Sequence, residues 1–202
     1  MMELKKHYQD LFAEHGNSSH AVQYSDSASQ FKRFEILQQI DRSMESVVDI
    51  GCGLGHLYEF LQTKNENIRY LGLDFVKEFI QAAQNTHGKD QVAFQVCDLY
   101  QDQIPSGYDY ALLSGVFNNL MPDNWGFMRM TLEKMFAAAN KGIAFNCMST
   151  YVDYFDAGLF YVNPCEVFDF CKRELGRKVV LRNEYLIREG SIPFECTFYV
   201  YK

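Results

Sequence analysis

The stretch VVDIGCGLGHLYEFL, residues 47–61, decides the fold, because it joins an apolar strand to an amphipathic helix through a loop with three alternating glycines. Gly51, Gly53 and Gly55 follow the strand and open the helix, where backbone N–H groups lack intrahelical partners and a missing Cβ leaves room. We therefore expect a small ligand to touch the backbone at this edge. Asp49 would place a negative charge beside it, which favours a ligand with positive charge and no phosphate.

A dinucleotide site would need a different glycine spacing. In the fingerprint G-x-G-x-x-G the third glycine comes later, and the pyrophosphate rests on the helix N-terminus. Here Gly55 comes one residue early, and His56 stands in the fingerprint position. A dehydrogenase built on the same strand–helix unit stays an alternative, which a nicotinamide-binding assay would decide.

Length and composition limit the possible answers. The chain has 202 residues, of which 48% are hydrophobic and 15% aromatic, so one domain spanning 1–202 is predicted. A formal net charge of −7 opposes a partner bound mainly through phosphates, and nucleic acid is disfavoured as a substrate. The N-terminal stretch MMELKKHYQDLFAEHG has charges at every turn, unlike a signal peptide or a membrane span. We therefore expect a cytoplasmic protein with no membrane partner.

Cysteine and histidine spacing gives little support for a metal site. The six cysteines form no C-x-x-C pair, and several lie in apolar runs, so reduced core residues are predicted. The five histidines form no H-x-x-x-H or H-x-E pattern. No bound metal is expected.

Apolar periodicity predicts an α/β fold of alternating strands and helices. The expected strands lie at 46–50, 68–75, 91–99, 108–117 and 142–149. A helix at 164–175 then precedes two strands, 178–187 and 194–202, joined by a short turn that contains EGSIP. This terminal hairpin means that one strand runs antiparallel in an otherwise parallel sheet. Two helices ahead of the first strand, near 3–15 and 29–40, form an N-terminal annex.

The chain resembles the class I S-adenosylmethionine-dependent methyltransferases of the small-molecule type. VVDIGCGLG is similar to their first motif, LGLDF to the acidic end of the second strand, VCDL to the adenine-binding segment, and YDYALLSGVFNN to the fourth-strand motif. The similarity covers roughly residues 45–202. It implies a Rossmann-like fold with a seven-stranded, mostly parallel sheet, one antiparallel strand from the C-terminal hairpin, and helices on both faces. An N-terminal helical lid or annex at 1–42 would precede a catalytic core at 43–202.

The resemblance also implies S-adenosylmethionine as cofactor and S-adenosylhomocysteine as product. The glycines would line the methionine part, with Asp49 near its ammonium group. Asp74 would accept hydrogen bonds from the ribose hydroxyls and Asp98 would face adenine, although a helix cap or a turn is the alternative role for both. Ser114 and Gly115 would pass beneath the sulfonium. The complete implied set is Tyr24, Arg33, Asp49, Gly51, Cys52, Gly53, Gly55, Asp74, Phe75, Cys97, Asp98, Leu99, Ser114 and Gly115.

The annex would contribute two of these residues through a helix that closes over the cofactor, as in related small-molecule methyltransferases. Tyr24 and Arg33 lie in HAVQYSDSASQFKRF. Arg33 would pair with the methionine carboxylate, because guanidinium–carboxylate contacts are strong and directional. A surface arginine on a packed helix is an equally open alternative.

The predicted function is methyl transfer to an O, N or C atom of a small-molecule acceptor held under the N-terminal lid. The transfer needs orientation and desolvation, with a base only where the acceptor must lose a proton. The candidate catalytic residues are Asp153, His20 and Asn118. The candidate substrate-binding residues are Phe117, Asn118, Tyr151 and Phe155. The aromatic segment STYVDYFDAGLFYVNP would form a pocket wall or, alternatively, a helix over the sheet.

Two other functions stay open at this point. One is a cofactor-binding partner subunit without catalysis, and the other is a protein or RNA methyltransferase. The fourth motif reads Ser-Gly-Val-Phe at 114–117 and lacks the Asn/Asp-Pro-Pro-aromatic pattern of nucleobase-amine and glutamine methyltransferases. Those substrates are therefore less favoured than a small molecule.

Overall fold

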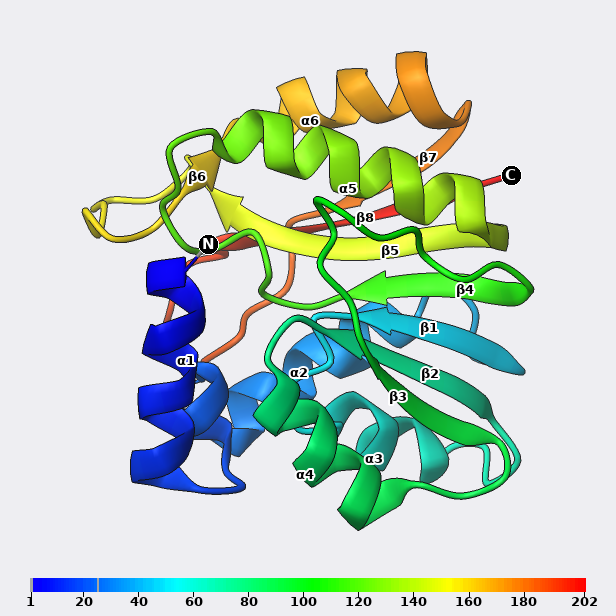
Figure 1. Ribbon diagram of the computed structural model, residues 1–202. Coiled ribbons are helices and arrows are strands. Elements are labelled where there is room, and N and C mark those ends of the chain that lie inside the picture. Colours follow the sequence, from blue (N-terminus) through cyan, green and yellow to red (C-terminus); the bar gives the residue numbers. More distant parts are fainter. Residues whose placement is uncertain (1, 25) are drawn as a thin grey trace.

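The computed structural model describes residues 2–24 and 26–202 and contains one mixed β-sheet flanked by helices on both faces (Figure 1). The strands are β1 (Ser46–Ile50), β2 (Arg69–Asp74), β3 (Val92–Val96), β4 (Tyr108–Leu113), β5 (Ala139–Ser149), β6 (Tyr161–Val162), β7 (Lys178–Arg182) and β8 (Glu195–Tyr201). Their order is β3-β2-β1-β4-β5-β8-β7, with β6 paired to β5 outside that path. Neighbours are parallel except that β8 runs antiparallel to β5 and β7. The predicted fold class is confirmed, and the two-residue β6 adds an eighth strand.

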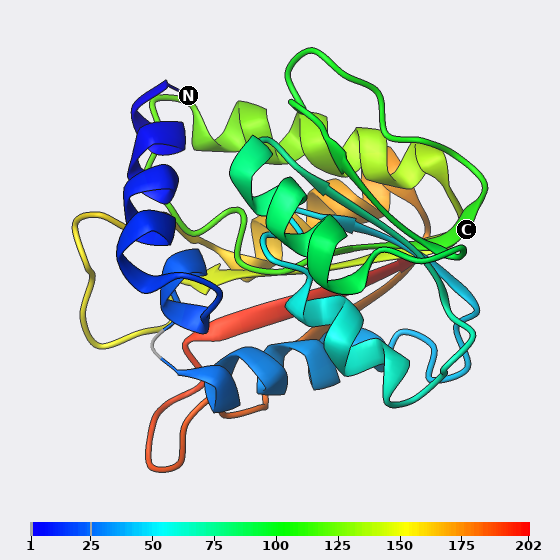
Figure 2. The same cartoon turned by 60° about the horizontal axis from the view of Figure 1, so that its bottom comes forward.

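The helices form two layers and an end cover. On one face lie α5 (Asn124–Ala138) and α6 (Pro164–Phe170), which η2 (Cys171–Leu175) continues (Figure 1). On the other face lie α2 (Ser27–Gln38), α3 (His56–Gln62) and α4 (Lys77–His87). The remaining two, α1 (Met2–His15) and η1 (Ser19–Val22), lie across the edge where the parallel strands end (Figures 1 and 2). Within the described ranges, no helix is both long and apolar enough to cross a membrane.

Helices on both faces explain why the central strands are apolar runs. A strand buried on both sides needs apolar side chains at every position and not only at alternate ones. All five residues of β1 are buried. Val48 and Ile50 belong to the core cluster that contains Met128 of α5, whereas Val47 belongs to the opposite cluster with Leu57 of α3. The first strand therefore joins the two halves of the core.

Acidic side chains fix where two of the helices begin. Asp26 precedes α2, and its carboxylate accepts a hydrogen bond from the Ser29 backbone N–H at 2.6 Å. Asp123 precedes α5 and accepts from the Gly126 N–H at 2.9 Å. Each carboxylate satisfies an N–H group that the first helical turn leaves unpaired. Replacing either acid with Ala would cost about 1 kcal/mol of stability.

The terminal hairpin differs from the prediction in its connection. The strand expected at 178–187 ends at Arg182, and the chain then leaves the sheet before returning as β8. Asn183 Nδ2 donates to the first carbonyl of β8 at 2.7 Å, which draws the chain out of the ladder. Tyr185 is buried in a small cluster with Ile36 of α2. Packing against the helix thus overrides the strand propensity of this stretch.

Candidate active site

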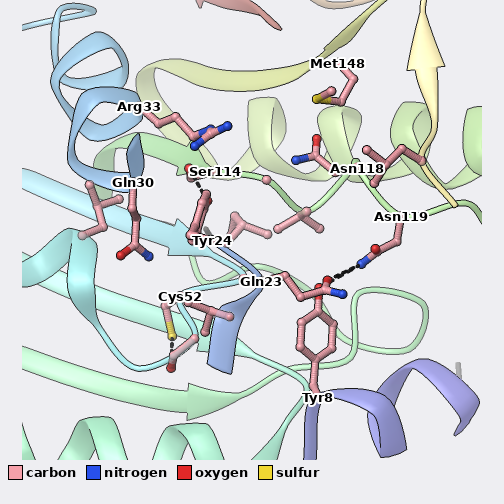
Figure 3. A pocket seen from close by; sticks show the side chains of 18 of the residues that line it. Tyr8, Gln23, Tyr24, Gln30, Arg33, Cys52, Ser114, Asn118, Asn119 and Met148 are labelled. Carbon is pink, nitrogen blue, oxygen red and sulfur yellow. Dashed lines mark hydrogen bonds between the residues drawn. The ribbon is translucent and has the colours of Figure 1, made fainter. Parts of the chain in front are cut away.

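A cavity of about 610 Å³ lies at the edge where β1, β2 and β4 end (Figure 3). Its walls come from the annex, the glycine loop after β1, the residues that follow β2 and β4, and the segment between β5 and β6. In open α/β sheets, ligands bind outside the carboxyl ends of the strands, where the loops and helix N-termini gather. The position of the cavity therefore makes it the candidate active site.

The glycine loop can turn sharply because its backbone is left-handed at three positions. The φ angles are +72° at Gly51, +53° at Gly53 and +86° at Gly55, values that other residues rarely adopt. Protein side chains fill the space that a Cβ would take. A Cβ on Gly51 would lie 2.3 Å from Val116 Cγ2, and one on Gly53 would lie 2.7 Å from Val22 Cγ1. Close ligand contact is therefore an incomplete explanation of these glycines, since turn geometry and packing already require them.

Asp74, the last residue of β2, is buried beside the cavity and holds the glycine loop in place. Its Oδ2 accepts the Gly53 N–H at 2.9 Å, and its Oδ1 accepts the Val76 N–H at 2.8 Å. Burial raises the pKa of Asp74 to about 6, against the opposing effect of these backbone hydrogen bonds. A carboxylate has about four acceptor positions, so Asp74 can still accept a hydroxyl group beside the backbone N–H groups of Gly53, Val76 and Phe75. Asp74 is therefore both a structural anchor and a lining residue.

Asp49, in β1, is a second buried carboxylate that lines the cavity. The Tyr70 hydroxyl donates to its Oδ2 at 2.5 Å. Burial, together with the nearby charge of Asp74, raises the pKa of Asp49 to about 7, against the opposing effect of the hydrogen bond from Tyr70. A cation bound in the cavity would stabilise the ionised form of both acids, because opposite charges attract strongly in a buried site.

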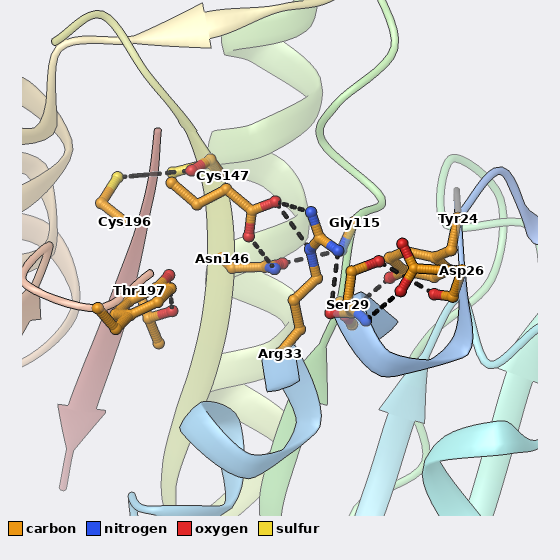
Figure 4. A network of polar contacts seen from close by, with 12 residues as sticks. Tyr24, Asp26, Ser29, Arg33, Gly115, Asn146, Cys147, Cys196 and Thr197 are labelled. Carbon is orange, nitrogen blue, oxygen red and sulfur yellow. Dashed lines mark hydrogen bonds and ion pairs between the residues drawn. The ribbon is translucent and has the colours of Figure 1, made fainter. Parts of the chain in front are cut away.

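Arg33 of α2 forms a buried ion pair with Glu195 of β8 (Figure 4). Its Nε donates to Glu195 Oε1 at 2.7 Å, and its Nη1 donates to the Ser29 carbonyl at 3.1 Å. Glu195 Oε2 accepts from Asn146 Nδ2 at 3.1 Å, and Asn146 Oδ1 accepts from the Gly115 N–H at 2.8 Å. A chain of polar contacts thus links the annex to the loop after β4.

Tyr24 stands beside Arg33 and reaches the same loop. Its hydroxyl lies 2.9 Å from Ser114 Oγ, and the guanidinium carbon of Arg33 lies 5.1 Å from its ring centroid. Burial raises the pKa of Tyr24, so its hydroxyl stays neutral near pH 7. Arg33 also lines the cavity, although its charge is already balanced by Glu195. Arg33 can therefore contact a ligand only through guanidinium N–H groups that do not already donate to Glu195 or Ser29.

The predicted cofactor-binding residues separate into two groups. Those that line the cavity are Tyr24, Arg33, Asp49, Gly51, Cys52, Gly53, Asp74, Phe75, Cys97, Leu99, Ser114 and Gly115. Gly55 and Asp98 do not line it. The Asp98 carboxylate instead accepts from the Tyr100 N–H at 3.0 Å and from Gln101 Nε2 at 3.1 Å. This is the turn role that the sequence left open as the alternative for Asp98.

The predicted catalytic residues are also divided. Asn118 and Asp153 line the cavity. His20 is not a lining residue, because η1 turns its ring toward His15, with the ring centroids 5.7 Å apart. Within the described residues, no group of three or more His, Cys, Asp or Glu side chains could hold a metal ion.

Three of the predicted substrate-binding residues lie away from the cavity lining. Phe117 is buried in the core, where its ring makes edge contacts with Phe127 and Phe145. Tyr151 and Phe155 lie on an irregular surface loop, and each is 61% exposed. The aromatic segment is therefore neither a continuous pocket wall nor a helix over the sheet. The residues of this segment that do line the cavity include Asp153, Tyr154 and Tyr161.

Sequence reasoning missed several lining residues, among them Tyr8, Gln30 and Met148 (Figure 3). Gln30 is 4% exposed and precedes Arg33 by less than one helical turn. Residues three apart share a helix face, so its spacing from Arg33 was an available signal. Tyr8 had no comparable signal, because its place depends on how α1 packs against the rest of the chain.

Known proteins with similar sequences or folds include methyltransferases. A family model described as a methyltransferase domain matches residues 48–142. The Mycobacterium tuberculosis (strain ATCC 25618 / H37Rv) protein named "Putative methyltransferase Rv1506c" is 32% identical over 154 residues, which cover 73% of this chain and 90% of that protein. The S-adenosylmethionine-dependent methyltransferase SibL, in its apo form, matches with a TM-score of 0.69 and 16% identity over 96% of this chain and 61% of SibL. The DhpI-SAH complex matches with a TM-score of 0.68 and 18% identity over 96% of this chain and 93% of DhpI.

The strand order and the glycine loop beside a buried acid define a Rossmann-like methyltransferase. This chain belongs to the methyltransferases, and its fold is that of solved methyltransferases that depend on S-adenosylmethionine. The residues at the cavity fit that molecule. Asp74 offers a fixed hydrogen-bond acceptor for ribose hydroxyls, and Asp49 offers negative charge for an ammonium group.

Proposed function

We propose that this enzyme methylates an O, N or C atom of a small molecule enclosed under its N-terminal annex. The observation that carries the proposal is the continuity of the cavity. One space of about 610 Å³ is lined both by the glycine loop and by the segment between β5 and β6. Small-molecule sites are commonly enclosed spaces of this size, lined by apolar groups and a few polar ones.

In this proposal residues 1–42 act as the lid and residues 43–202 as the catalytic core. The Tyr8 hydroxyl of α1 accepts a hydrogen bond from Asn119 Nδ2 at 2.9 Å, and the same Nδ2 donates to Gln23 Oε1 at 3.1 Å. Gln23 has φ +61°, the one positive value at a non-glycine residue in the described ranges. A strained residue beside a ligand site is a feature of clamps and switches. The lid is thus fastened to the loop that follows β4.

The chain's residues bind and orient the two reactants. When bound, the cofactor supplies an activated methyl group on a sulfonium leaving group. Asp74 accepts hydrogen bonds from the ribose hydroxyls, and Asp49 faces the ammonium group. Ser114 and Gly115 support the sulfonium end, and Arg33 turns its remaining donors toward the methionine carboxylate. Together these contacts would place the methyl carbon beside the space for the acceptor. Holding the two reactants in the reactive geometry accelerates the transfer.

On the acceptor side, Asn118 and Asp153 are the polar candidates. Asn118 faces the cavity directly after the β4 loop (Figure 3). Asp153 is an exposed residue at the surface loop, where it would take a proton from an acceptor that has to lose one. Apolar side chains form most of the remaining wall and exclude water from the reacting groups.

Binding and transfer assays test this function directly. Calorimetry should detect S-adenosylhomocysteine but not a nicotinamide dinucleotide, and the product should raise the melting temperature by mass action. Transfer of labelled methyl groups should then be compared between a small-molecule extract, total RNA and a protein extract. Label appearing only in RNA or protein would exclude an enclosed small-molecule site, and failure to bind S-adenosylhomocysteine would exclude the enzyme's proposed role altogether.

A further inference from the structure

Two polar side chains that line the cavity, Tyr24 and Asn118 (Figure 3), approach the backbone of Gly115. The point that a Cβ on Gly115 would occupy lies 2.8 Å from the Tyr24 hydroxyl and 3.7 Å from Asn118 Nδ2. The cavity lining also includes the apolar side chains of Met121 and Met148. A few polar groups placed together in a binding cavity fix the orientation of a ligand there.

Asn118 presents N–H donors at this point. Its Oδ1 is buried and has no hydrogen-bond partner in the described part of the chain, whereas its Nδ2 is the side-chain atom near Gly115. The backbone of Asn118 is fixed on both sides, because its N–H donates to the Gly115 carbonyl at 3.3 Å and its carbonyl accepts from the Phe160 N–H at 2.8 Å. The side-chain amide of Asn118 is therefore held at the cavity wall, and its N–H groups donate to no described residue.

Tyr24 adds a neutral hydroxyl near this point. That hydroxyl shares a hydrogen bond of 2.9 Å with Ser114 Oγ, and the Arg33 guanidinium lies against its ring. The two carboxylates of the segment between β5 and β6 that line the cavity, Asp153 and Asp156, belong to exposed residues of the surface loop. Two buried acids also act on the Tyr24 hydroxyl, and each has a balancing group: Arg33 pairs with Glu195, and the cofactor's ammonium group is proposed to face Asp49.

We propose, building on the function proposed above, that the methyl acceptor is an ionised oxygen acid, a carboxylate or a phenolate, whose oxygen is held by Asn118 and Tyr24. An oxyanion accepts hydrogen bonds from both groups. Its lone pair forms the O–CH₃ bond while the S–CH₃ bond breaks and the electron pair of that bond stays on sulfur. No proton has to leave, so no protein base is required. Positive and negative charge cancel in this step, which an apolar, water-excluding cavity favours.

Four single-ring probes distinguish the possible acceptors by binding alone. Benzoate, nitrophenolate, aniline and toluene share one ring and differ in the group that they present. With the enzyme saturated with S-adenosylhomocysteine, calorimetry should show one of the two anions binding about tenfold or more tighter than aniline and toluene, as expected for charge-assisted hydrogen bonds. The two anionic probes separate a carboxylate from a phenolate acceptor.

Two matched variants assign that preference to the amide. Asn118→Leu keeps the size of the side chain but removes the donors, and it should weaken the preferred anion about tenfold. Met148→Leu changes the same cavity without removing a donor, and it should change that affinity less than about threefold. Affinity for S-adenosylhomocysteine should be unchanged in both variants, which shows that the proteins are folded.

The outcomes separate this proposal from the proposed function. Tighter binding of aniline, equal binding of all four probes, absence of probe binding, or an unchanged anion affinity in Asn118→Leu would overturn the oxyanion assignment while leaving the methyltransferase intact. Absence of S-adenosylhomocysteine binding in the unaltered protein would instead overturn the proposed function. With a carbon-13 methyl donor, the product spectrum must show a methyl carbon bonded to oxygen, and a methyl on nitrogen or carbon contradicts the assignment.

Discussion

Arg33 and Glu195 form an ion pair that is nearly closed to solvent, with 10% of the Arg33 side chain and 1% of the Glu195 side chain exposed. The pair joins α2 of the annex to β8 of the sheet. Through Asn146, Glu195 also reaches the backbone of Gly115. Removing one member of a buried pair leaves the other charge without compensation, which costs more than the pair itself contributes. The annex and the loop after β4 are therefore energetically coupled.

Removing one charge of this pair should destabilise the fold more than removing both charges. Glu195→Gln leaves the buried Arg33 charge uncompensated and should lower the free energy of unfolding by about 3 kcal/mol or more. The double variant Arg33→Met/Glu195→Gln removes both charges and should recover most of that loss. Urea denaturation measures both values. Equal losses in the single and double variants would show that the charges themselves do not matter.

Asp74 should control cofactor affinity through two effects at once. Asp74→Ala removes the acceptor proposed for ribose and the anchor of the Gly53 N–H. Affinity for S-adenosylhomocysteine should fall by on the order of 2–4 kcal/mol, measured by calorimetry. Asp109→Asn is a matched control, because that carboxylate pairs with Lys141 and does not line the cavity. An unchanged affinity in a folded Asp74→Ala protein would leave Asp74 with the anchoring role only.

The buried acids predict a pH dependence of stability with a definite sign. The pKa of Asp49 is about 7 and that of Asp74 about 6 in the folded protein, above the ordinary value of 3.8 expected in the unfolded chain. The folded state therefore keeps protons that the unfolded state releases. Both groups therefore contribute to the free energy of unfolding. This stabilisation is fully present below about pH 4 and is lost as the pH rises through about 6 and 7.

Asp49→Asn should remove part of that dependence. Without ligand, the urea midpoint of the unaltered protein should fall between about pH 5 and about pH 8, and the variant should show a smaller fall. Substituting the exposed Asp169, which pairs with Arg173 at the surface, with Asn serves as a control that leaves the slope unchanged. A slope that is identical in the Asp49 variant would mean that Asp49 is ionised throughout this range.

Loosening the lid should speed release of the product. Asn119→Ala removes the donor shared by Tyr8 and Gln23, and the dissociation rate of S-adenosylhomocysteine should rise about fivefold, as expected for the loss of about 1 kcal/mol. Stopped-flow fluorescence measures this rate. Gln9→Ala is the control, because Gln9 joins α1 to Glu78 of α4 and does not reach the loop after β4. Equal acceleration in both variants would place the restraint elsewhere on α1.

The part of the annex that can be deleted is smaller than the predicted lid. Leu37 of α2 is fully buried and the Tyr199 hydroxyl donates to the Ile36 carbonyl, so removal of 1–42 would open the core. Deletion of 1–24 removes α1 and η1 and spares α2. We expect this variant to keep its circular dichroism spectrum and cooperative unfolding but to lose methyl transfer to the small-molecule acceptor. Full activity of the shortened protein would contradict an enclosed site.

The strands and the glycine loop were predictable because their signals are local. An apolar run, a turn that needs positive φ and an amphipathic helix all lie within 47–61. The partner of Arg33 was not predictable, since Glu195 is 162 residues away along the chain. Asp98 shows a third case, in which a family motif and a local turn favour different roles for one side chain. Local patterns thus predict the helices and strands and their order, whereas the direction in which an individual side chain points depends on tertiary packing.

The placement of β8 has a consequence for how the chain is made. β8 follows β7 in sequence, yet it lies between β5 and β7 in the sheet. Until Glu195–Tyr201 has left the ribosome, β5 presents an unpaired backbone edge and Arg33 has no counter-ion. Open strand edges pair readily with neighbouring chains, and partly made domains aggregate by that route. Insertion of β8 covers this edge, so the same late event that completes the ion pair also ends the exposure of β5 to intermolecular strand pairing.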